Sequence, residues 1–256
     1  MQIIIPMAGL SERFIRAGYK KPKPLIKIDD ACMIEHVIRL FPGEKNFLFI
    51  CNKIHARNFN LEKILKKVCP SGKIQLIDYK NSGPVSSIVE CFKNIADEEP
   101  AIVNYCDFNM HWDFGHFKRK IVFDNLDGAV VCYTGFHPHL LRYNFYAGVK
   151  SEPSGRILEI MEKHSFTPNK FDSWHSCGAY YFKSGAMMKK YFMKLVNKKQ
   201  KINGEYYVSM VYNEMIKDGL NCGIYPINYF CQWGTPSDLR DYLYWSEFFL
   251  NNNNER

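Results

Sequence analysis

Apolar residues along the chain alternate between short continuous runs and stretches with helical spacing. Residues 2–5 form an apolar, β-branched run that ends at Pro6, which predicts a buried strand leading into a loop. A helical pattern over 33–41 and a second buried run over 47–51 follow. The same alternation continues with a predicted helix at 60–68, a strand at 74–78, a helix from Pro84 and a strand at 101–105. Such alternation predicts a parallel sheet with helices on both faces.

The second half of the chain departs from this alternation. After a buried strand predicted at 128–132, two segments at 145–150 and 156–161 alternate apolar and polar residues around the turn-forming Pro153-Ser154-Gly155. The remaining predicted elements are a strand at 178–182, helices at 184–196 and 204–218, a strand at 222–227 and a helix from Pro236. We expect one α/β domain over residues 1–250, with a parallel core and a mixed insertion, and a disordered polar tail over 251–256.

Composition excludes several classes of protein. The 256 residues are 46% hydrophobic and 23% charged, so the chain has enough apolar surface to bury a core. Nine scattered cysteines without a Cys-x-x-Cys pair argue against a disulfide framework or a structural zinc site. The apolar runs are far shorter than the roughly 20 residues of a spanning helix, and no secretory signal is evident. We therefore expect a soluble, cytoplasmic protein with no membrane partner.

The net charge points to an anionic partner. With 34 Lys+Arg against 26 Asp+Glu, the chain carries +8, which fits nucleic acid, an anionic membrane or a site that handles phosphates. The basic clusters on predicted helices, such as the one from Lys189 to Lys201, are typical of solvated faces. The cluster from Arg13 to Lys27 instead lies in a predicted loop. A basic cluster in a loop, rather than on a helix face, favours a site that binds phosphates.

The first loop of the predicted sheet has the residues of a phosphate site. Ligands of an open parallel sheet bind beyond the carboxyl ends of its strands. Here Gly9 follows the first strand, and Arg13 and Lys23 come after it. Glycine lets backbone N–H groups approach a phosphate, and the two cations neutralise it. Neither a Walker A loop nor a dinucleotide fingerprint is present. The alternative is an ordinary turn with a solvated basic edge, but Pro22 and Pro24 fix the direction of Lys23 more than such an edge requires.

Two later loops carry further candidates. Gly83 and the hydroxyl residues around it open the helix from Pro84, where they are able to bind a base or ribose or simply to cap the helix. The fourth strand is followed by Asp107, a single carboxylate placed to hold a magnesium ion that bridges phosphates. For Asp107 too, the alternative is a capping role.

The order of these motifs resembles the nucleotidyltransferases that join a nucleoside triphosphate to a sugar phosphate or a similar phosphate. The resemblance covers nearly the whole chain, and its N-terminal signature is the most specific part. Its motifs are Ile5 to Gly9 with Arg13 and Phe14, Pro22 to Leu25, the Gly83 segment, Asp107, Glu162-Lys163, Cys177 to Phe182, Gly204 to Tyr207 and Trp233 to Leu239. It implies a Rossmann-like three-layer α/β/α sandwich with a mostly parallel, mixed central sheet.

The resemblance also implies roles for matching positions. Arg13 is expected to neutralise the β- and γ-phosphates, Lys23 to hold the α-phosphate and the attacking phosphate, and Asp107 to bind the cofactor Mg²⁺. The other implied contacts are with the nucleotide at Ala8, Gly9, Gly83 and Ser86 and with the acceptor at Lys163 and Glu205. Many family members carry a second metal-binding Asp near Trp233, where this chain has none directly adjacent. Glu205 or Asp238 could replace it, or no second protein ligand exists.

Within the family the chain is most similar to the small cytidylyltransferases of cell-surface carbohydrate assembly. These include the CTP:phosphoglutamine cytidylyltransferases of capsular phosphoramidate biosynthesis, so the resemblance implies CMP transfer from CTP to phosphoglutamine with release of pyrophosphate. Transfer from UTP or dTTP to a sugar 1-phosphate is the main alternative. A basic RNA-binding protein is an alternative of another class, although no recognition-module signature appears. The sequence leaves the oligomeric state open.

Overall fold

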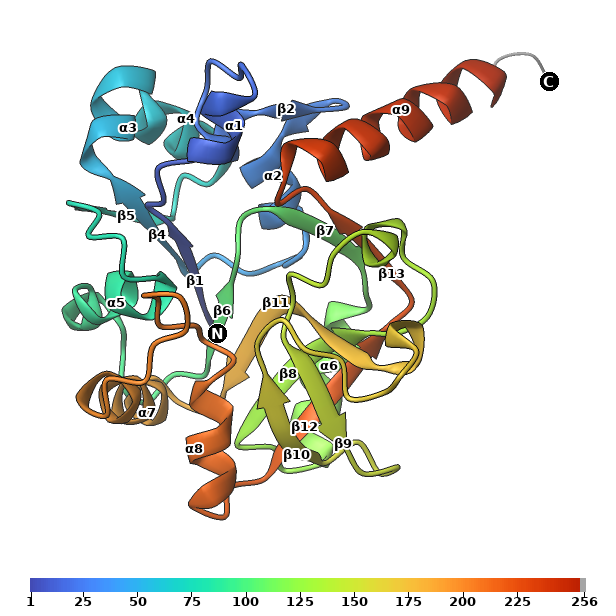
Figure 1. Ribbon diagram of the computed structural model, residues 1–256. Coiled ribbons are helices and arrows are strands. Elements are labelled where there is room, and N and C mark those ends of the chain that lie inside the picture. Colours follow the sequence, from blue (N-terminus) through green and yellow to red (C-terminus); the bar gives the residue numbers. More distant parts are fainter. Residues whose placement is uncertain (254–256) are drawn as a thin grey trace.

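A nine-stranded sheet runs through the computed structural model, which describes residues 1–253 (Figure 1). Its N-terminal half is parallel, in the spatial order β5 (Lys73–Ile77), β4 (Phe47–Asn52), β1 (Gln2–Met7) and β6 (Ala101–Asn104). The other half consists of β11 (Trp174–Phe182), β8 (Gly128–Tyr133), β12 (Cys222–Ile227), β9 (Gly148–Ser151) and β10 (Ile157–Met161). Only β10 and β11 run against the others, so the predicted mostly parallel, mixed sheet is confirmed.

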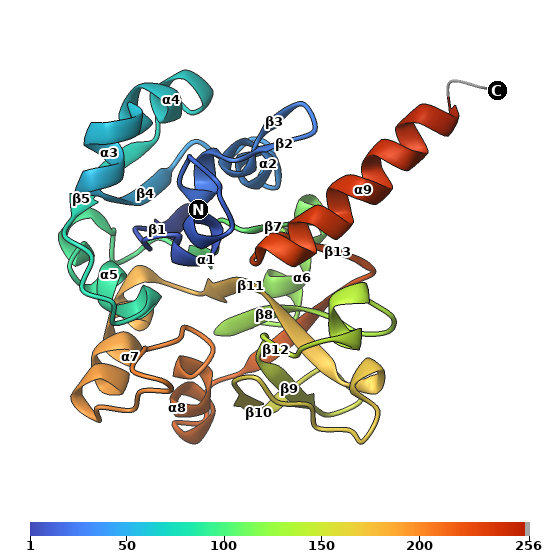
Figure 2. The ribbon, with the colours of Figure 1, turned by 45° about the horizontal axis from the view of Figure 1, so that its top comes forward.

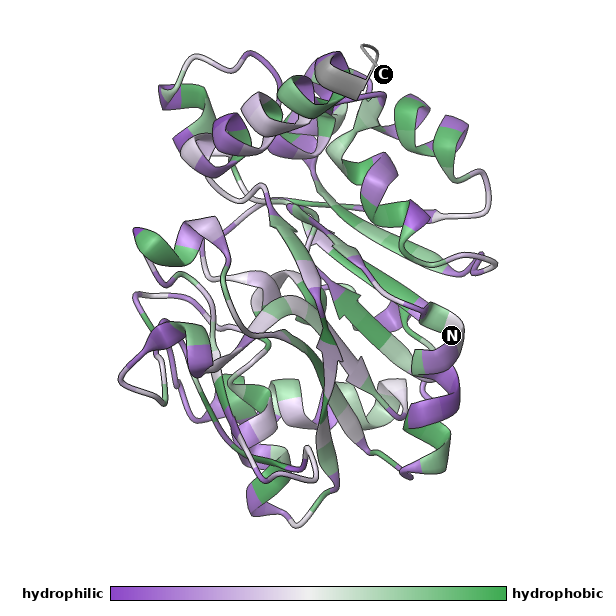
Figure 3. Cartoon of the chain, turned by 90° about the vertical axis from the view of Figure 1, so that its right-hand side faces the viewer, coloured by the Kyte–Doolittle hydropathy of each residue, from purple (hydrophilic) through white to green (hydrophobic). Residues whose placement is uncertain are grey.

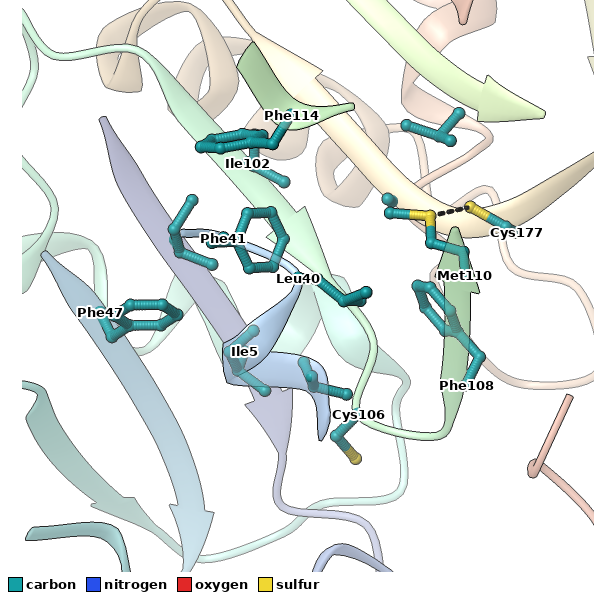
Figure 4. Packing of buried hydrophobic residues seen from close by; sticks show 14 of the residues in the cluster. Ile5, Leu40, Phe41, Phe47, Ile102, Cys106, Phe108, Met110, Phe114 and Cys177 are labelled. Carbon is teal, nitrogen blue, oxygen red and sulfur yellow. Dashed lines mark hydrogen bonds between the residues drawn. The ribbon is translucent and has the colours of Figure 1, made fainter. Parts of the chain in front are cut away.

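Helices cover both faces of this sheet, because successive strand residues point to opposite sides. Ile3 and Ile5 of β1 pack into one apolar cluster and Ile4 into the other. The first cluster includes α2 (Met33–Arg39), α4 (Leu61–Val68) and α6 (Phe114–Phe123), and the second α5 (Pro84–Val89), α7 (Gly185–Asn197) and α8 (Val211–Lys217). Figure 4 shows Phe41, Ile102 and other labelled side chains of the first cluster around Ile5. The hydropathy of the residues agrees with this layered arrangement, because the strands are mainly hydrophobic and the helices carry both hydrophobic and hydrophilic residues (Figure 3).

Smaller elements join the layers. They are α1 (Glu12–Arg16), α3 (Lys53–Phe59), the ribbons β2 (Lys27–Ile28) with β3 (Ala31–Cys32) and β7 (Phe108–His111) with β13 (Tyr229–Gln232), and short 3₁₀ turns at Lys23–Leu25, Phe92–Asn94, Pro138–Leu141 and Lys170–Asp172. The last helix, α9 (Pro236–Asn253), extends away from the rest of the chain (Figure 2).

The predicted tail boundary at 251 is wrong. Helix α9 continues through Asn253, because extending an existing helix costs far less than starting one. Residues 254–256 of the predicted tail lie outside the described residues. All nine cysteine thiols are free. No helix within 1–253 has the length and apolar character needed to cross a bilayer.

The predicted helix at 204–218 begins only at Val211. Before it, Asn203 and Gly204 form a tight turn with φ values of 50° and 82°, and Ile202 and Glu205 exchange backbone hydrogen bonds. The chain then runs beside the segment before α5, where the Tyr206 N–H donates to the Ser82 carbonyl at 3.0 Å. This long-range pairing, rather than local helix propensity, determines the start of α8.

Candidate active site

After β1 the chain continues to β4, on one side of β1 in the sheet, and after β6 it continues to β8, which lies beyond β11 in the opposite direction. The loops after these two strands therefore separate and open a crevice, the usual ligand position in such sheets. The crevice holds a cavity of about 410 Å³ and, against part of the same wall, a smaller one of about 180 Å³. The larger cavity falls within the size range of small-molecule sites.

All sequence-predicted site residues but one line these cavities. The larger is lined by Gly9, Arg13, Lys23, Asp107, Lys163 and Glu205, and the smaller by Ala8, Gly9, Lys23, Gly83, Asp107 and Glu205. The exception is Ser86, whose hydroxyl donates to the Ser82 carbonyl at 3.1 Å. Ser87 lines the smaller cavity instead. Consecutive residues of a helix lie about 100° apart around its axis, so Ser86 and Ser87 face different directions.

The loop after β1 is held at both ends. Asn52, at the end of β4, donates from its side-chain amide to the Ala8 carbonyl at 3.1 Å. Ser11 adopts a left-handed conformation with φ 60°, and its hydroxyl accepts a hydrogen bond from the Lys23 backbone N–H at 2.9 Å. These contacts bring Lys23 next to the glycine loop and keep both segments in place.

Lys23 and Asp107 form an ion pair inside the crevice. Lys23 Nζ lies 2.7 Å from Asp107 Oδ2, and the two side chains are 24% and 23% exposed. Burial alone would lower the pKa of the Lys23 ammonium, but the charge of Asp107 and its hydrogen bond outweigh burial, so this pKa lies above its ordinary value. Lys23, the predicted phosphate ligand, and Asp107, the predicted metal ligand, thus neutralise each other's charge although they lie 84 residues apart in the sequence.

Gly83 has a structural reason to be glycine. Its φ is +86°, and a Cβ there would come within 2.7 Å of the backbone N and O of Tyr206. The Val85 N–H also donates to the Tyr206 carbonyl at 3.3 Å. This close approach places Glu205 and Tyr207 on the wall that both cavities share.

Glu162 was missed as a site residue, although it adjoins Lys163 in one of the quoted motifs. It follows β10, lines the larger cavity and accepts a hydrogen bond from the Ser209 hydroxyl. Burial raises the pKa of Glu162 to about 7, against the opposing effect of the Ser209 hydrogen bond. Lys163 beside it has a left-handed φ of 55° and is exposed, with its Nζ 6.0 Å from the centre of the Tyr207 ring.

Replacing Glu162 by glutamine is expected to stabilise the protein at alkaline pH. Since the folded-state pKa is raised from 4.5 to about 7, the wild type loses free energy of unfolding as the pH rises through this window. Glutamine does not titrate, so the advantage of Glu162→Gln should grow from near zero at pH 4.5 to about 1–3 kcal/mol at pH 8. Urea denaturation at several pH values measures it. The exposed Glu98→Gln is the control, and a pH-independent advantage of Glu162→Gln would contradict the prediction.

The cavity fits a magnesium ion that is shared with phosphates. Within the described residues no three His, Cys, Asp or Glu side chains are arranged to hold a metal by themselves. Asp107, however, already has the Lys23 ammonium as a cationic partner, and the Gly234 backbone passes so close that a Cβ there would lie 3.1 Å from Asp107 Oδ2. A Mg²⁺ site with one carboxylate and phosphate oxygens matches the usual preference of this ion.

The two proposed substitutes for a second metal ligand are placed differently. Asp238 does not line the cavity, since its carboxylate accepts hydrogen bonds from Gln232 and Thr235 behind the wall. Glu205 lines both cavities. Gln232, which the sequence interpretation passed over, lines the larger cavity and donates a hydrogen bond to Asp238.

Comparison with known proteins extends the description of the fold. No protein-family model matches the chain, and no curated protein matches its sequence. A nucleoside-diphosphate-sugar pyrophosphorylase from Vibrio cholerae RC9 superposes with a TM-score of 0.74 at 20% identity, covering 94% of this chain and 99% of that one. A structure described as a candidate glucose-1-phosphate thymidylyltransferase from Bacillus anthracis, in complex with sucrose, superposes with a TM-score of 0.72 at 16% identity, covering 94% and 93%. At these identities the likeness shows the fold, and it confirms the predicted Rossmann-like sandwich.

Proposed function

We propose that the protein is a nucleotidyltransferase that moves a nucleoside monophosphate from a triphosphate to the phosphate of a small acceptor. The observation that carries the proposal is the convergence of the Gly9 loop, Arg13, Lys23 and Asp107 on one cavity between β1 and β6. Arg13 and Lys23, together with the carboxylate of Asp107, suit two phosphorylated substrates and a bridging Mg²⁺. The fold shared with two structures described as sugar-nucleotide enzymes supports it.

The reaction needs charge stabilisation and alignment rather than a protein nucleophile. An oxygen of the acceptor phosphate forms a bond to the α-phosphorus, and the bond from that phosphorus to the bridging oxygen breaks and releases pyrophosphate. Lys23 holds the two phosphates whose repulsion opposes this step, and Arg13 stabilises the charge that develops on the pyrophosphate. When bound to Asp107, Mg²⁺ supplies further neutralisation of the phosphate oxygens.

A sugar 1-phosphate is the acceptor that we propose. The names of both structural neighbours refer to sugar nucleotides or to glucose 1-phosphate. They support this alternative better than CMP transfer to phosphoglutamine, which gains no support from them. Glu162, Lys163 and Glu205 line the part of the wall to which acceptor binding is assigned, and carboxyl groups there offer hydrogen bonds to sugar hydroxyls. Cytidylyl specificity and a role in capsule synthesis stay predictions.

Half of the six lysines in the basic cluster from Lys189 to Lys201 are paired with carboxylates, which disfavours the RNA-binding alternative. In the cluster from Lys189 to Lys201, three lysines lie within 2.6–2.7 Å of carboxylates on neighbouring elements. These ion pairs are Lys189 with Asp97, Lys194 with Asp218, and Lys198 with Glu214. Such pairs are typical of a solvated helix face and not of a free basic patch.

Pyrophosphate release with a matrix of substrates tests the proposed function. The purified protein and Mg²⁺ are combined with CTP, UTP, dTTP, ATP or GTP and with glucose 1-phosphate, other sugar 1-phosphates or phosphoglutamine. We expect release that requires both a pyrimidine triphosphate and a sugar 1-phosphate. Release with CTP and phosphoglutamine alone would restore the narrower prediction, and no release with any pair would contradict nucleotidyl transfer.

A further inference from the structure

A strip of aromatic side chains lies on α9, the helix that extends away from the rest of the chain (Figure 2). The side chains of this aromatic strip are 48–66% exposed, and their neighbouring rings have centroids 5.5–6.0 Å apart. The strip consists of Tyr244, Trp245, Phe248 and Phe249. Its members recur at four-residue spacing and therefore lie along one side of the helix. Another side holds α9 to the body, since the hydroxyls of Tyr242 and Ser246 both donate to Asp29 at 2.8 Å.

Further exposed apolar surface adjoins the strip. Arg142 Nη1 lies 3.0 Å from Asp241 Oδ2, one helical turn before Trp245, and the neighbours Leu141 and Tyr143 are 63% and 56% exposed. An aromatic side chain buries about 150–250 Å², so four that are about half exposed offer roughly 300–550 Å². With Leu141 and Tyr143 added, the surface supplies a large part of the roughly 800 Å² that each partner buries in a standard interface. A patch of this size marks an interaction surface.

Two opposite charges flank the strip and indicate what covers it. Arg240 and Glu247 are exposed, and they lie on the same edge of α9 because seven residues make nearly two full turns. Within residues 1–253 neither forms an ion pair. Antiparallel packing of two α9 helices brings Arg240 of each copy beside Glu247 of the other, whereas parallel packing brings like charges together. A twofold axis makes the favourable contact twice.

An anionic membrane fits this helix less well. Helices that lie on membranes are rich in Lys and Arg on their polar face. Within its described side chains α9 instead carries the three carboxylates Asp238, Asp241 and Glu247 against the single cation Arg240. The charge of the helix therefore opposes binding to an anionic surface, while its distribution favours a second copy of the same helix.

We propose that the aromatic strip is the interface of a twofold dimer, in which the α9 helices of two copies of this chain pack antiparallel. The inference goes beyond the proposed function and does not depend on it. The segment that carries Leu141 and Tyr143 borders the interface, and Tyr143 stacks on Phe145 with ring centroids 5.0 Å apart. Phe145 in turn lines the larger cavity. The interface therefore lies beside the segment that supplies one wall of the candidate active site.

Sedimentation velocity of the full chain over a wide range of concentrations tests the dimer. We expect the wild type to associate reversibly to a dimer. Trp245→Glu puts a charge into the centre of the interface and should weaken association about a hundredfold, as loss of a buried tryptophan anchor does. Because Trp245 is 51% exposed in the monomer, the variant should fold, which circular dichroism checks. A wild type that is monomeric at every concentration, or a dimer that Trp245→Glu leaves intact, would overturn the proposal.

Exchange of the flanking charges tests the antiparallel arrangement and does not alter the aromatic residues. Arg240→Glu and Glu247→Arg each bring like charges together twice, so either should weaken the dimer about tenfold at low salt. The double variant Arg240→Glu/Glu247→Arg should restore wild-type association. Arg57→Glu changes the net charge as Arg240→Glu does, at an exposed position of α3, and is the matched control. Equal weakening in Arg57→Glu, or no recovery in the double variant, would contradict this dimer.

Cosedimentation with vesicles of phosphatidylcholine and phosphatidylglycerol tests the other occupant. We expect the wild type to stay in the supernatant, because the strip is covered by the second copy. A monomeric wild type that binds the vesicles, and loses this binding in Trp245→Glu, would overturn the dimer and assign the aromatic strip to a lipid surface.

Discussion

Replacement of Asp107 by alanine is expected to abolish nucleotidyl transfer at every magnesium concentration. Asp107 lines both cavities, and its carboxylate pairs with Lys23. Without it the wall loses the carboxylate that is expected to hold the cation, and several kcal/mol of charge stabilisation are lost in the transition state. This corresponds to a fall in turnover of about a thousandfold or more. Pyrophosphate release over a range of Mg²⁺ concentrations measures it.

Two further variants separate the charge of Asp107 from its structural contacts. Asp107→Asn keeps the size and an acceptor for Lys23 but removes the charge, so we expect it to be as inactive as the alanine variant. Asp124→Asn is the matched control, because Asp124 pairs with Lys120 at 2.6 Å with similar exposure, 30% and 34%, outside both cavities. Its activity should be unchanged. Near-normal turnover in folded Asp107→Ala would remove this residue from the mechanism.

The central strands and the position of the site could be predicted because both depend on local pattern. Strands buried on two faces appear as unbroken apolar runs, as in β1 and β4, and the carboxyl ends of parallel strands meet at one edge. From these facts alone Gly9 and Asp107 were expected on the same side of the sheet. The structure places both at the cavities.

The parts that could not be predicted depend on contacts between distant segments. The start of α8 follows from the pairing of Tyr206 with Ser82, and the unusual pKa of Glu162 follows from its burial beside Ser209. Gln232 lines the larger cavity, where the pairing of β13 with β7 brings it. None of these partners lies near its counterpart in sequence, so no local pattern carries the information. Ser86 is a different case. One residue along a helix turns the side chain by about 100° around the axis, and it is Ser87 and not Ser86 that lines the smaller cavity.

These contacts also show how the site avoids charge repulsion before substrates bind. Lys23 is neutralised by Asp107, while Arg13 is exposed, with its guanidinium carbon 5.4 Å from the centre of the Phe145 ring. The aromatic face attracts the cation without cancelling its charge. Of the two cations, Arg13 is therefore the one whose charge is fully offered to an incoming phosphate.

Replacement of Arg13 by alanine is accordingly expected to lower turnover by about a hundredfold or more, the effect of removing one electrostatic contact from the transition state. The folded state should hardly change, because Arg13 is exposed and a cation–aromatic contact at the surface contributes about 0.5–1 kcal/mol. Steady-state kinetics of pyrophosphate release should show the loss mainly in kcat, since the charge on the leaving pyrophosphate develops during the reaction.

Arg16 provides the matched control for this variant on the same short helix. It lies one turn further along α1, is 80% exposed and pairs with Glu12 at 3.1 Å, without lining the cavity. Arg16→Ala removes the same charge from the same helix, so long-range electrostatics change equally in both variants. If Arg16→Ala loses as much turnover as Arg13→Ala, general attraction of anions explains the effect. A loss confined to Arg13 instead requires direct contact with the phosphates, because the net charge of the two variants is identical.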